Sequence, residues 1–369
     1  MTGATRARIP FLELAPATAE LREQLDAAIA RVLDSGWYLL GAELEAFEAE
    51  WAAYAGAEHC VAVGSGLDAL RFGLEAYGIG PGDEVLVPGQ TFIATWLAVT
   101  ATGAQPVPVD VSPDHHALEP DAAAAAVTPR TAAILPVDLY GQPADLAGLR
   151  ALADRHGLLL LDDAAQAHGA RLHDRPVAAY AHLSAWSFYP GKNLGALGDA
   201  GAVTTDDAAI ADRVRRLRNY GSARRYEHAE IGYNSRLDEL QAAVLRVKLE
   251  ALDEWNERRA AIAARYLREL GGVTPLAVRD GAQPSWHLFP VCSERRDALR
   301  GHLDAAGIDT LIHYPVPPHR QGAYAGTALA AADLPVADRI AAGVLSLPIG
   351  PHLHADEVDR VIEAVAAFS

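Results

Sequence analysis

Cysteine and lysine are scarce in this chain of 369 residues. Its two cysteines, Cys60 and Cys292, lie far apart and in no CxxC pair, which argues against a disulfide framework and against a cysteine-ligated metal site. Lysine occurs only at Lys192 and Lys248, although Lys and Arg together number 31. Because a lysine amine can form a Schiff base and an arginine cannot, these two positions are the candidates for amine chemistry.

The chain also lacks excess positive charge and long apolar runs. Its formal net charge of −17 opposes binding to nucleic acid or to anionic membranes, since both need a basic surface. No stretch approaches the length needed to span a bilayer, and no run typical of a signal peptide follows the first ten residues. We therefore expect a cytoplasmic protein that contacts neither nucleic acid nor membrane and binds any anionic ligand through a local basic patch.

Half of the residues are apolar, which is enough for a large core, and the apolar segments alternate between strand and helix patterns. This alternation specifies an α/β fold with a mostly parallel sheet covered by helices, and ligands on such sheets bind at the carboxyl ends of the strands. Strands are predicted within 58–66, 83–88, 105–110, 131–141 and 158–165, and helices at 67–78, 92–101 and 145–157.

The last third of the chain has a different pattern. A long helix with an apolar stripe is predicted from about Leu237 to Trp255, and it would connect two domains. The segments beyond it indicate a smaller α+β domain, so we divide the chain into a large domain, 1–249, and a small C-terminal domain, 250–369. The small domain is predicted to hold helices at 258–267, 295–307 and 356–368 and a strand at 286–292.

Lys192 lies between glycines in a tight loop after an apolar strand, where a side chain can face a cleft; a lysine on an exposed turn is the alternative. The strand at 158–165 ends in Asp162 and Asp163, whose side chains point to opposite faces because a strand alternates. One of these carboxylates can therefore face the cleft and pair with the protonated pyridine nitrogen of pyridoxal phosphate, although a helix cap is the other interpretation.

Three further features favour a planar ligand that carries phosphate. The Gly-Ser-Gly turn at 64–66 lies between a strand and a helix, where free amides hold phosphates, although many such turns bind none. Phe92 begins the next helix, where its ring could stack on the ligand or fill the core. Six arginines occur between residues 213 and 225, and those in the helical part of this segment are typical of a solvent-exposed helix face. Arg224 and Arg225 instead follow a glycine break and suit capture of a diphosphate.

These segments resemble, in order and almost end to end, the DegT/DnrJ/EryC1/StrS family of pyridoxal-phosphate-dependent sugar aminotransferases. The resemblance implies the aspartate-aminotransferase-like fold (fold type I), with a mostly parallel seven-stranded sheet in the large domain and a smaller α+β C-terminal domain. It rests on GSGLDAL, VPGQTFIATWLAV, PVDLYGQPAD, DDAAQAHGA, SFYPGKNLGALGDAG, YGSARRYEHAEIGYNSRLDELQAAVL and HYPVPPH.

The resemblance also implies roles for individual residues. Lys192 would be the catalytic lysine that forms a Schiff base with the cofactor, and Asp163 would pair with the pyridine nitrogen. Gln166 would contact the phenolic oxygen, and Phe92 would stack on the ring. The phosphate would be held by Ser65, Gly66, Leu67 and Ser187, with Asn234 of the neighbouring subunit, which implies a homodimer with shared active sites.

Within the family, GLDALR, TFIATWLAVTATGA and the segment around YGSARRYEH resemble most closely the enzymes that aminate carbon 3 of dTDP-3-keto-6-deoxyhexoses. This implies ping-pong transfer of an amino group from L-glutamate, with Lys192 as general base. Ala200 departs from the family pattern, which has glycine there. The candidate sugar-binding residues are Arg224, Arg225, Tyr226, His228, His313 and Tyr314, of which the last two also suit a core role.

Other functions stay open at this point: amination at carbon 4, a 3-dehydratase, or a non-catalytic sensor. Lys192 and the shortage of cysteine argue against dehydratases that carry histidine or an iron–sulfur cluster, and the acidic chain offers no DNA-binding segment for a regulator. His352 and His354, near Asp356 and Glu357, could suggest a metal site but better suit a helix cap, so no metal is expected.

Overall fold

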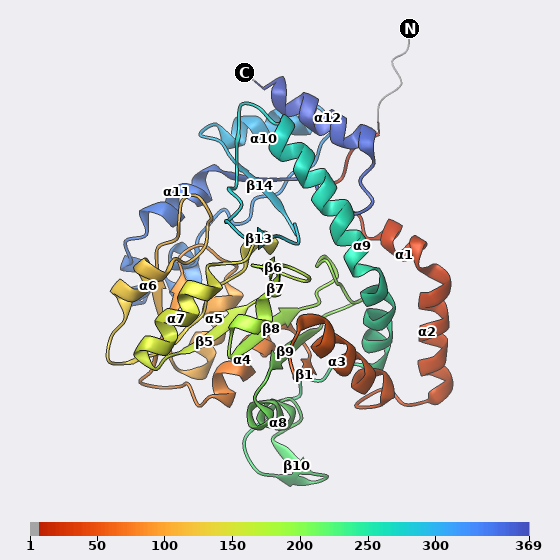
Figure 1. The fold of residues 1–369 in the computed structure, drawn as a ribbon, viewed down its shortest axis with the longest axis vertical. Coiled ribbons are helices and arrows are strands. Elements are labelled where there is room, and N and C mark those ends of the chain that lie inside the picture. The colour runs from red at the N-terminus through yellow and green to blue at the C-terminus, as the bar shows by residue number, and fades with distance from the viewer. Residues whose placement is uncertain (1–6, 369) are drawn as a thin grey trace.

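A seven-stranded sheet forms the centre of the protein, of which the computed structural model describes residues 7–368 (Figure 1). Neighbouring strands are parallel except at β9, which runs antiparallel to both β1 and β8. The predicted mostly parallel sheet of seven strands is confirmed. In spatial order the strands are β1 (His59–Val63), β9 (Gly201–Thr205), β8 (Leu183–Ser187), β5 (Leu159–Asp163), β4 (Thr131–Ile134), β2 (Glu84–Pro88) and β3 (Gln105–Val109).

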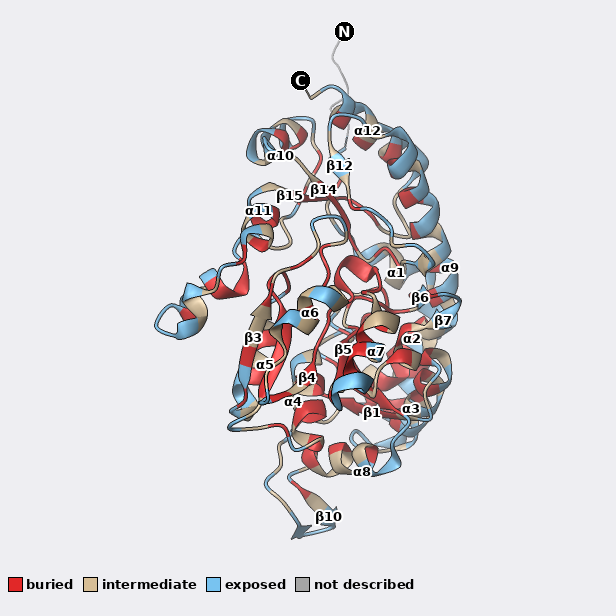
Figure 2. Ribbon diagram, turned by 60° about the vertical axis from the view of Figure 1, so that its left-hand side comes forward, coloured by how far each residue is buried: buried red, intermediate tan, exposed pale blue. Residues whose placement is uncertain are grey.

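Helices cover both faces of this sheet. Successive strand residues contribute to different apolar clusters, as Val61 and Ala62 do, because side chains alternate across a strand. One cluster joins the sheet to α3 (Ala42–Ala55), α6 (Pro120–Ala126), α7 (Leu146–His156) and α9 (Glu239–Glu269), and the other joins it to α4 (Gly66–Ala76), α5 (Ala94–Thr102) and α8 (Ala208–Leu217). Burial on both faces explains why the strands are near-continuous apolar runs (Figure 2).

Helix α9 is 31 residues long and runs from beside the sheet to the C-terminal elements (Figure 1). It packs first against α2 (Arg22–Ser35) and α3 and later against α12 (Ala355–Ala366). The sequence predicted two helices in this region, but the structure has one, and the predicted division between 249 and 250 falls inside it. Arg259, buried on α9, donates to the carbonyls of Trp286 and Ile349, both at 3.3 Å, and so ties the helix to the C-terminal elements.

The C-terminal elements surround an apolar cluster of their own. The N-terminal segment enters this cluster through Ile9, whose N–H donates to the carbonyl of Gly307 at 2.8 Å. Among residues 7–368, no helix is both long and apolar enough to cross a membrane. These elements are a sheet of β12 (Thr274–Pro275), β14 (Phe289–Cys292) and β15 (Val344–Leu347), with α10 (Arg296–Ala305), α11 (Pro335–Gly343) and α12.

The described chain also contains shorter elements, among them the 3-10 helices η1 (Leu139–Gly141), η2 (Val177–Tyr180), η3 (Pro318–Arg320), η4 (Gly322–Tyr324) and η5 (Ala328–Ala331). A helix, α1 (Ala15–Glu20), precedes α2, and the hairpin of β10 (Ser222–Arg224) and β11 (Glu227–His228) projects beyond α8 (Figures 1 and 2). A small antiparallel sheet consists of β13 (Ala282–Gln283), β6 (Arg171–Leu172) and β7 (Arg175–Pro176).

The start of α9 caps the start of α3. Gly41 is the N-cap of α3 and has no side chain to offer, and the buried carboxylate of Glu239 takes its place. Its oxygens accept from the N–H groups of Gly41 at 2.7 Å, Glu43 at 2.9 Å and Leu44 at 3.3 Å. A residue almost 200 positions away therefore satisfies donors that a helix terminus leaves free.

We predict that Glu239→Ala lowers the free energy of unfolding by about 1–3 kcal/mol, because it leaves buried amides without acceptors. Urea unfolding followed by circular dichroism measures this loss. Glu45→Ala, at an exposed position of α3, is the matched control and should change stability by less than about 0.5 kcal/mol. Equal losses in the two variants would contradict the capping role of Glu239.

Candidate active site

Lys192 is presented by a tight loop between β8 and β9. The loop closes on itself, since the N–H of Lys192 donates to the carbonyl of Tyr189 and the N–H of Ala196 to that of Phe188, both at 2.8 Å. The side chain of Lys192 is half-buried, and within residues 7–368 nothing accepts a hydrogen bond from its Nζ. Burial lowers the pKa of Lys192 to about 8, an effect that the charge of Asp163 opposes. Near neutral pH a larger fraction of this amine is therefore unprotonated than in an ordinary exposed lysine.

Asp163 ends β5 on the side of Lys192. Thr95, on α5, donates from Oγ1 to Oδ2 of Asp163 at 2.8 Å, and the N–H of Ala165 donates to Oδ1 at 3.3 Å. Burial raises the pKa of Asp163, whereas these two donors and the charge of Lys192 lower it. The sequence did not single out Thr95, although its spacing from Thr91 is that of one helical turn, and the two hydroxyls lie 2.9 Å apart.

Asp162 points to the other face of β5, which resolves the ambiguity of the Asp-Asp pair. Its nearest donor is the hydroxyl of Ser184 at 3.4 Å, and its Oδ1 has no partner. Burial raises the pKa of Asp162 well above its usual value, and the nearby charges of Asp138 and Asp163 raise it further. Burial and like charge therefore disfavour the ionised form of Asp162, and Asp163 is the carboxylate that shares a site with Lys192.

The Gly-Ser-Gly turn meets the end of β8. A Cβ on Gly66 would lie 2.7 Å from Cβ of Ser187, and one on Gly201 would clash with the backbone of Ser65. Only glycine fits at these two positions, so backbone amides at the start of α4 stay accessible, with Ser187 beside them. Leu67 follows them on the helix and is exposed. The neighbouring Ala200, where the family has glycine, is buried in the core.

The rings of Phe92 and Tyr314 are in contact. The ring of Phe92 is 53% exposed, which excludes a core role, and its centroid lies 5.4 Å from that of Tyr314. Gln166 donates from Nε2 to Oη of Tyr314 at 3.2 Å and accepts from the N–H of Tyr140 at 2.6 Å. Three predicted site residues, from different parts of the sequence, are thus brought together.

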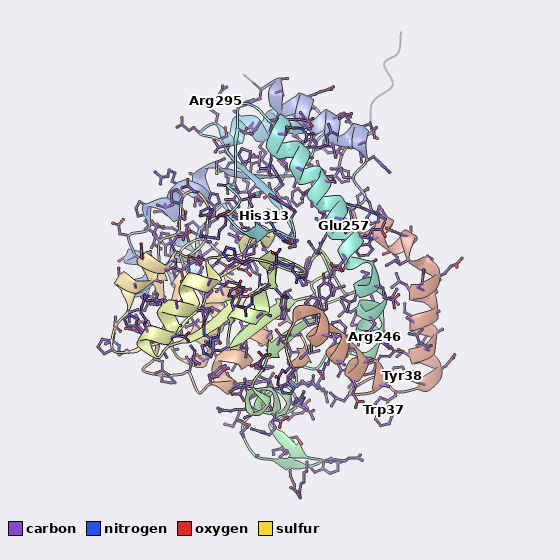
Figure 3. All side chains as sticks on the ribbon, in the orientation of Figure 1. Trp37, Tyr38, Arg246, Glu257, Arg295 and His313 are labelled. Carbon is purple, nitrogen blue, oxygen red and sulfur yellow. The ribbon has the colours of Figure 1, made fainter. Side chains whose placement is uncertain are left out.

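His313 lies between the large sheet and the C-terminal strands (Figure 3). Its Nδ1 is 2.9 Å from the hydroxyl of Ser346, and its carbonyl accepts from Oη of Tyr140 at 2.7 Å. Burial lowers the pKa of His313 to about 4, and the charge of Lys192 lowers it further. His313 is therefore neutral and close to Lys192. His287 is a neutral neighbour that the sequence did not reveal, because its position depends on its contact with Asn193, at 3.2 Å.

The predicted residues of the β10–β11 hairpin are not brought to Lys192 within one chain. Tyr226 is 82% exposed, and among the residues that the structure describes the guanidinium of Arg225 donates a hydrogen bond only to the hydroxyl of Tyr226, at 3.3 Å. Arg224 is also exposed, and His228 contacts the carbonyl of Tyr220 at 2.8 Å. The hairpin lies on the far side of α8 from the C-terminal elements (Figures 1 and 2).

Asn234 is exposed as well, although its neighbour Ser235 reaches the Gly-Ser-Gly turn. The hydroxyl of Ser235 accepts from the N–H of Gly64 at 2.9 Å, whereas Oδ1 of Asn234 accepts from Arg236 at 2.8 Å. The side chain of Asn234 therefore faces outward from the chain.

The two C-terminal histidines have separate partners. Nε2 of His352 lies 2.5 Å from the carboxylate of Glu20, and the N–H of His354 donates to the carboxylate of Glu357 at 2.9 Å, which caps α12. In the part of the chain that the structure describes, no group of three or more His, Cys, Asp and Glu could hold a metal ion.

Comparisons with known proteins agree with this geometry. The chain is 59% identical to a dTDP-3-amino-3,4,6-trideoxy-alpha-D-glucose transaminase of Streptomyces venezuelae, over 98% of this chain and 96% of that protein. It superposes on the crystal structure of S. venezuelae DesV in complex with a ketimine intermediate with a TM-score of 0.95, at 59% identity, over 97% and 98% of the two chains. A structure of NtdA from Bacillus subtilis with bound cofactor PMP gives a TM-score of 0.93 at 31% identity, over 99% of this chain and 86% of that chain.

The model of one family covers most of the sequence, at residues 19–366. With Lys192 and Asp163 close together at the carboxyl end of the large sheet, this match shows that the chain belongs to the DegT/DnrJ/EryC1/StrS aminotransferase family.

Proposed function

We propose that this protein transfers an amino group from L-glutamate to the 3-keto carbon of a dTDP-linked 6-deoxyhexose, as a cytoplasmic homodimer that uses pyridoxal phosphate. The observation that carries the proposal is the unbonded, half-buried amine of Lys192 beside the carboxylate of Asp163. The choice of sugar is supported by the relative at 59% identity, whose name specifies a dTDP-3-amino sugar.

The residues present fit pyridoxal phosphate. Lys192 offers the amine, Asp163 the partner for the pyridine nitrogen, and Phe92 an exposed ring to stack on. The turn at 64–66 and Ser187 form a cradle that an added Cβ would fill, as a phosphate site at a helix N-terminus requires. When bound, the cofactor supplies an electron sink for the substrate carbon.

Lys192 then moves the proton. With a pKa of about 8, its Nζ can be neutral when it accepts a proton from the α-carbon of the amino donor, and can return a proton when the sugar carbon is aminated. His313 and His287, both neutral, add no competing charge beside it. The hydroxyl of Tyr314 and the amide of Gln166 are placed to orient the planar ring.

Incubation with L-glutamate and a dTDP-3-keto-6-deoxyhexose tests this proposal, and NMR of the product locates the new nitrogen. We predict an amine on carbon 3, and loss of turnover in Lys192→Ala by more than about a thousandfold, because no other lysine can replace it. Lys192→Ala should also lose the visible absorbance of attached cofactor. An amine on carbon 4 would contradict the regiochemistry, and full activity of Lys192→Ala would contradict the site.

The two adjacent aspartates provide a matched pair of variants. Asp163→Asn should keep the cofactor but slow turnover about tenfold or more, because a neutral amide does not hold the pyridine nitrogen protonated. Asp162→Asn should keep nearly the full rate, because its side chain points to the other face of β5 and burial already disfavours its ionised form. Single-turnover kinetics measures both rates. The opposite order of effects would assign the pairing role to Asp162.

A homodimer would bring Asn234 and the hairpin arginines, which lie away from Lys192 in one chain, to the active site of the partner. Asn234 faces outward, and large apolar side chains are exposed on the hairpin and on the Lys192 loop. Exposed apolar surface of this extent is typical of interaction sites. We propose that Asn234 and the hairpin pair Arg224-Arg225 serve the site of the partner, where the arginines would hold the diphosphate of the sugar nucleotide. Tyr226 lies on the hairpin, and Tyr189 and Leu197 lie on the Lys192 loop; Ile231, just after the hairpin, and Trp37, between α2 and α3, are exposed as well.

Mixing two inactive variants tests the shared site. Lys192→Ala and Asn234→Ala subunits that exchange freely should recover roughly a quarter of the activity, because half of the dimers then hold one intact site. Coupled assays before and after exchange measure the recovery. The control is a mixture of Lys192→Ala with the double variant that carries both Lys192→Ala and Asn234→Ala. This mixture should recover no activity, because neither subunit has Lys192. No recovery in the first mixture would mean that Asn234 acts within its own chain.

A further inference from the structure

Helix α9 touches the Lys192 loop at three places. Oε1 of Gln241 accepts from the N–H of Leu197 at 2.7 Å, and Nζ of Lys248 donates to the carbonyl of Gly195 at 2.7 Å. Further along, Oδ1 of Asn256 accepts from Nδ2 of Asn193 at 2.9 Å. The three helix residues are seven and eight positions apart, about two turns each time, so they form one polar stripe that faces the loop.

Lys248 is the middle contact of this stripe. Its side chain is 7% exposed, and burial lowers its pKa to about 8. Within residues 7–368 no carboxylate pairs with it, and the carbonyl of Gly195 is its hydrogen-bond acceptor. Burying an ammonium group without a carboxylate partner costs folding free energy. Because Lys248 is buried, it is not an ordinary solvent-exposed lysine, and its contact with the loop needs another explanation.

The composition of the chain makes Lys248 more unusual. Every basic residue other than Lys192 and Lys248 is arginine, and these two lysines meet at the same loop. A compact ammonium can serve a single carbonyl in a narrow space, whereas a guanidinium is a wide fork that needs several acceptors. Lysine is therefore suited to this position in a way that arginine is not.

The loop itself leaves little room for adjustment. A Cβ on Gly195 would clash with the backbone of Pro190, so the two ends of the loop lie in close contact around Lys192. Asn193 adds a bond from its Nδ2 to the carbonyl of Ser285 at 2.7 Å. The direction of the Lys192 side chain thus depends on a backbone turn that α9 holds from one side.

Building on the proposed role of Lys192, we propose that Lys248 is a positioning residue. Its bond to the carbonyl of Gly195, with Gln241 and Asn256 on either side, holds the loop 189–197 in the turn that directs Nζ of Lys192 toward Asp163. Lys248 touches no reacting atom and acts only through this loop.

Lys248→Met tests the proposal, because it keeps an unbranched buried side chain and removes the donor. Two quantities are measured: amide hydrogen exchange of residues 189–197 in the cofactor-free protein, and the rate at which pyridoxal phosphate attaches to Lys192. Attachment is trapped with borohydride and located by peptide mass spectrometry. We expect exchange in the loop to be faster, and attachment to be slower, each by about tenfold or more, as for loss of a hydrogen bond to a charged group.

Arg246→Met is the matched control. Arg246 lies on the same helix, but its guanidinium bonds to Glu50 at 2.7 Å and faces α3 rather than the loop (Figure 3). It should leave loop exchange and attachment at the wild-type values. If Lys248→Met behaves like wild type in both measurements, or if Arg246→Met shows the same changes, the positioning role is wrong.

A second variant covers the case in which Lys248→Met does not fold. Gln241→Leu removes the neighbouring contact at Leu197 from a half-buried position, and it should change both quantities in the same direction by a smaller factor. If Gln241→Leu changes neither the hydrogen exchange of the loop nor the rate of attachment, the proposal is wrong. If the wild-type protein fails to attach pyridoxal phosphate, the proposed function is contradicted. The role of Lys248 is still tested in that case, because the hydrogen-exchange measurement needs no cofactor.

Discussion

Charge buried at the carboxyl end of β5 is the constraint on which the site depends. Asp138, Asp162 and Asp163 are all buried there, and burial raises the pKa of each, to about 8 for Asp138. Like charges in a poorly solvated region cannot all be ionised. Asp163 has a hydroxyl donor on α5 and the charge of Lys192 nearby, and both lower its pKa and so favour its ionised form. The surrounding sheet and helices hold these groups where water cannot solvate them.

Much of the fold follows from local patterns in the sequence. The strands of the sheet are buried on both faces, so they appear as short apolar runs, and the helices between them show one apolar stripe. The continuity of α9 was not predicted, since the sequence was divided into separate helices at 237–255 and 258–267. In the structure the segment is one helix, which packs against α12 and is tied by Arg259 to the carbonyls of Trp286 and Ile349. The short strands and the capping of α3 by Glu239 depend on distant contacts that no local pattern encodes.

The site was predictable to a different degree for each residue. Composition identified Lys192 and Lys248 as the candidate lysines, and the loop position favoured Lys192. The strand pattern identified Asp162 and Asp163 as a pair whose side chains point to opposite faces, but it could not show which of the two faces the cleft. Thr95, Asn193 and His287 were missed, since their importance lies in contacts across the fold. Arg224 and Arg225 were suggested by their place in a loop after a glycine break, whereas Asn234 was suggested only by the family resemblance. All three side chains are exposed in one chain, so contacts within the chain do not assign them a role.

This arrangement separates the chemistry of the site from its selectivity. The half-buried Lys192 and the buried Asp163 are held by β5, the loop after β8 and α9, whereas the candidate sugar-binding arginines lie on an exposed hairpin beyond α8 (Figure 1). Which carbon of a sugar reaches Lys192 depends on where the diphosphate is held, because a small shift of a distant anchor moves the reacting atom. The hairpin can vary without disturbing the buried charges. A change of sugar is therefore expected to need changes at the hairpin before any at Lys192 or Asp163.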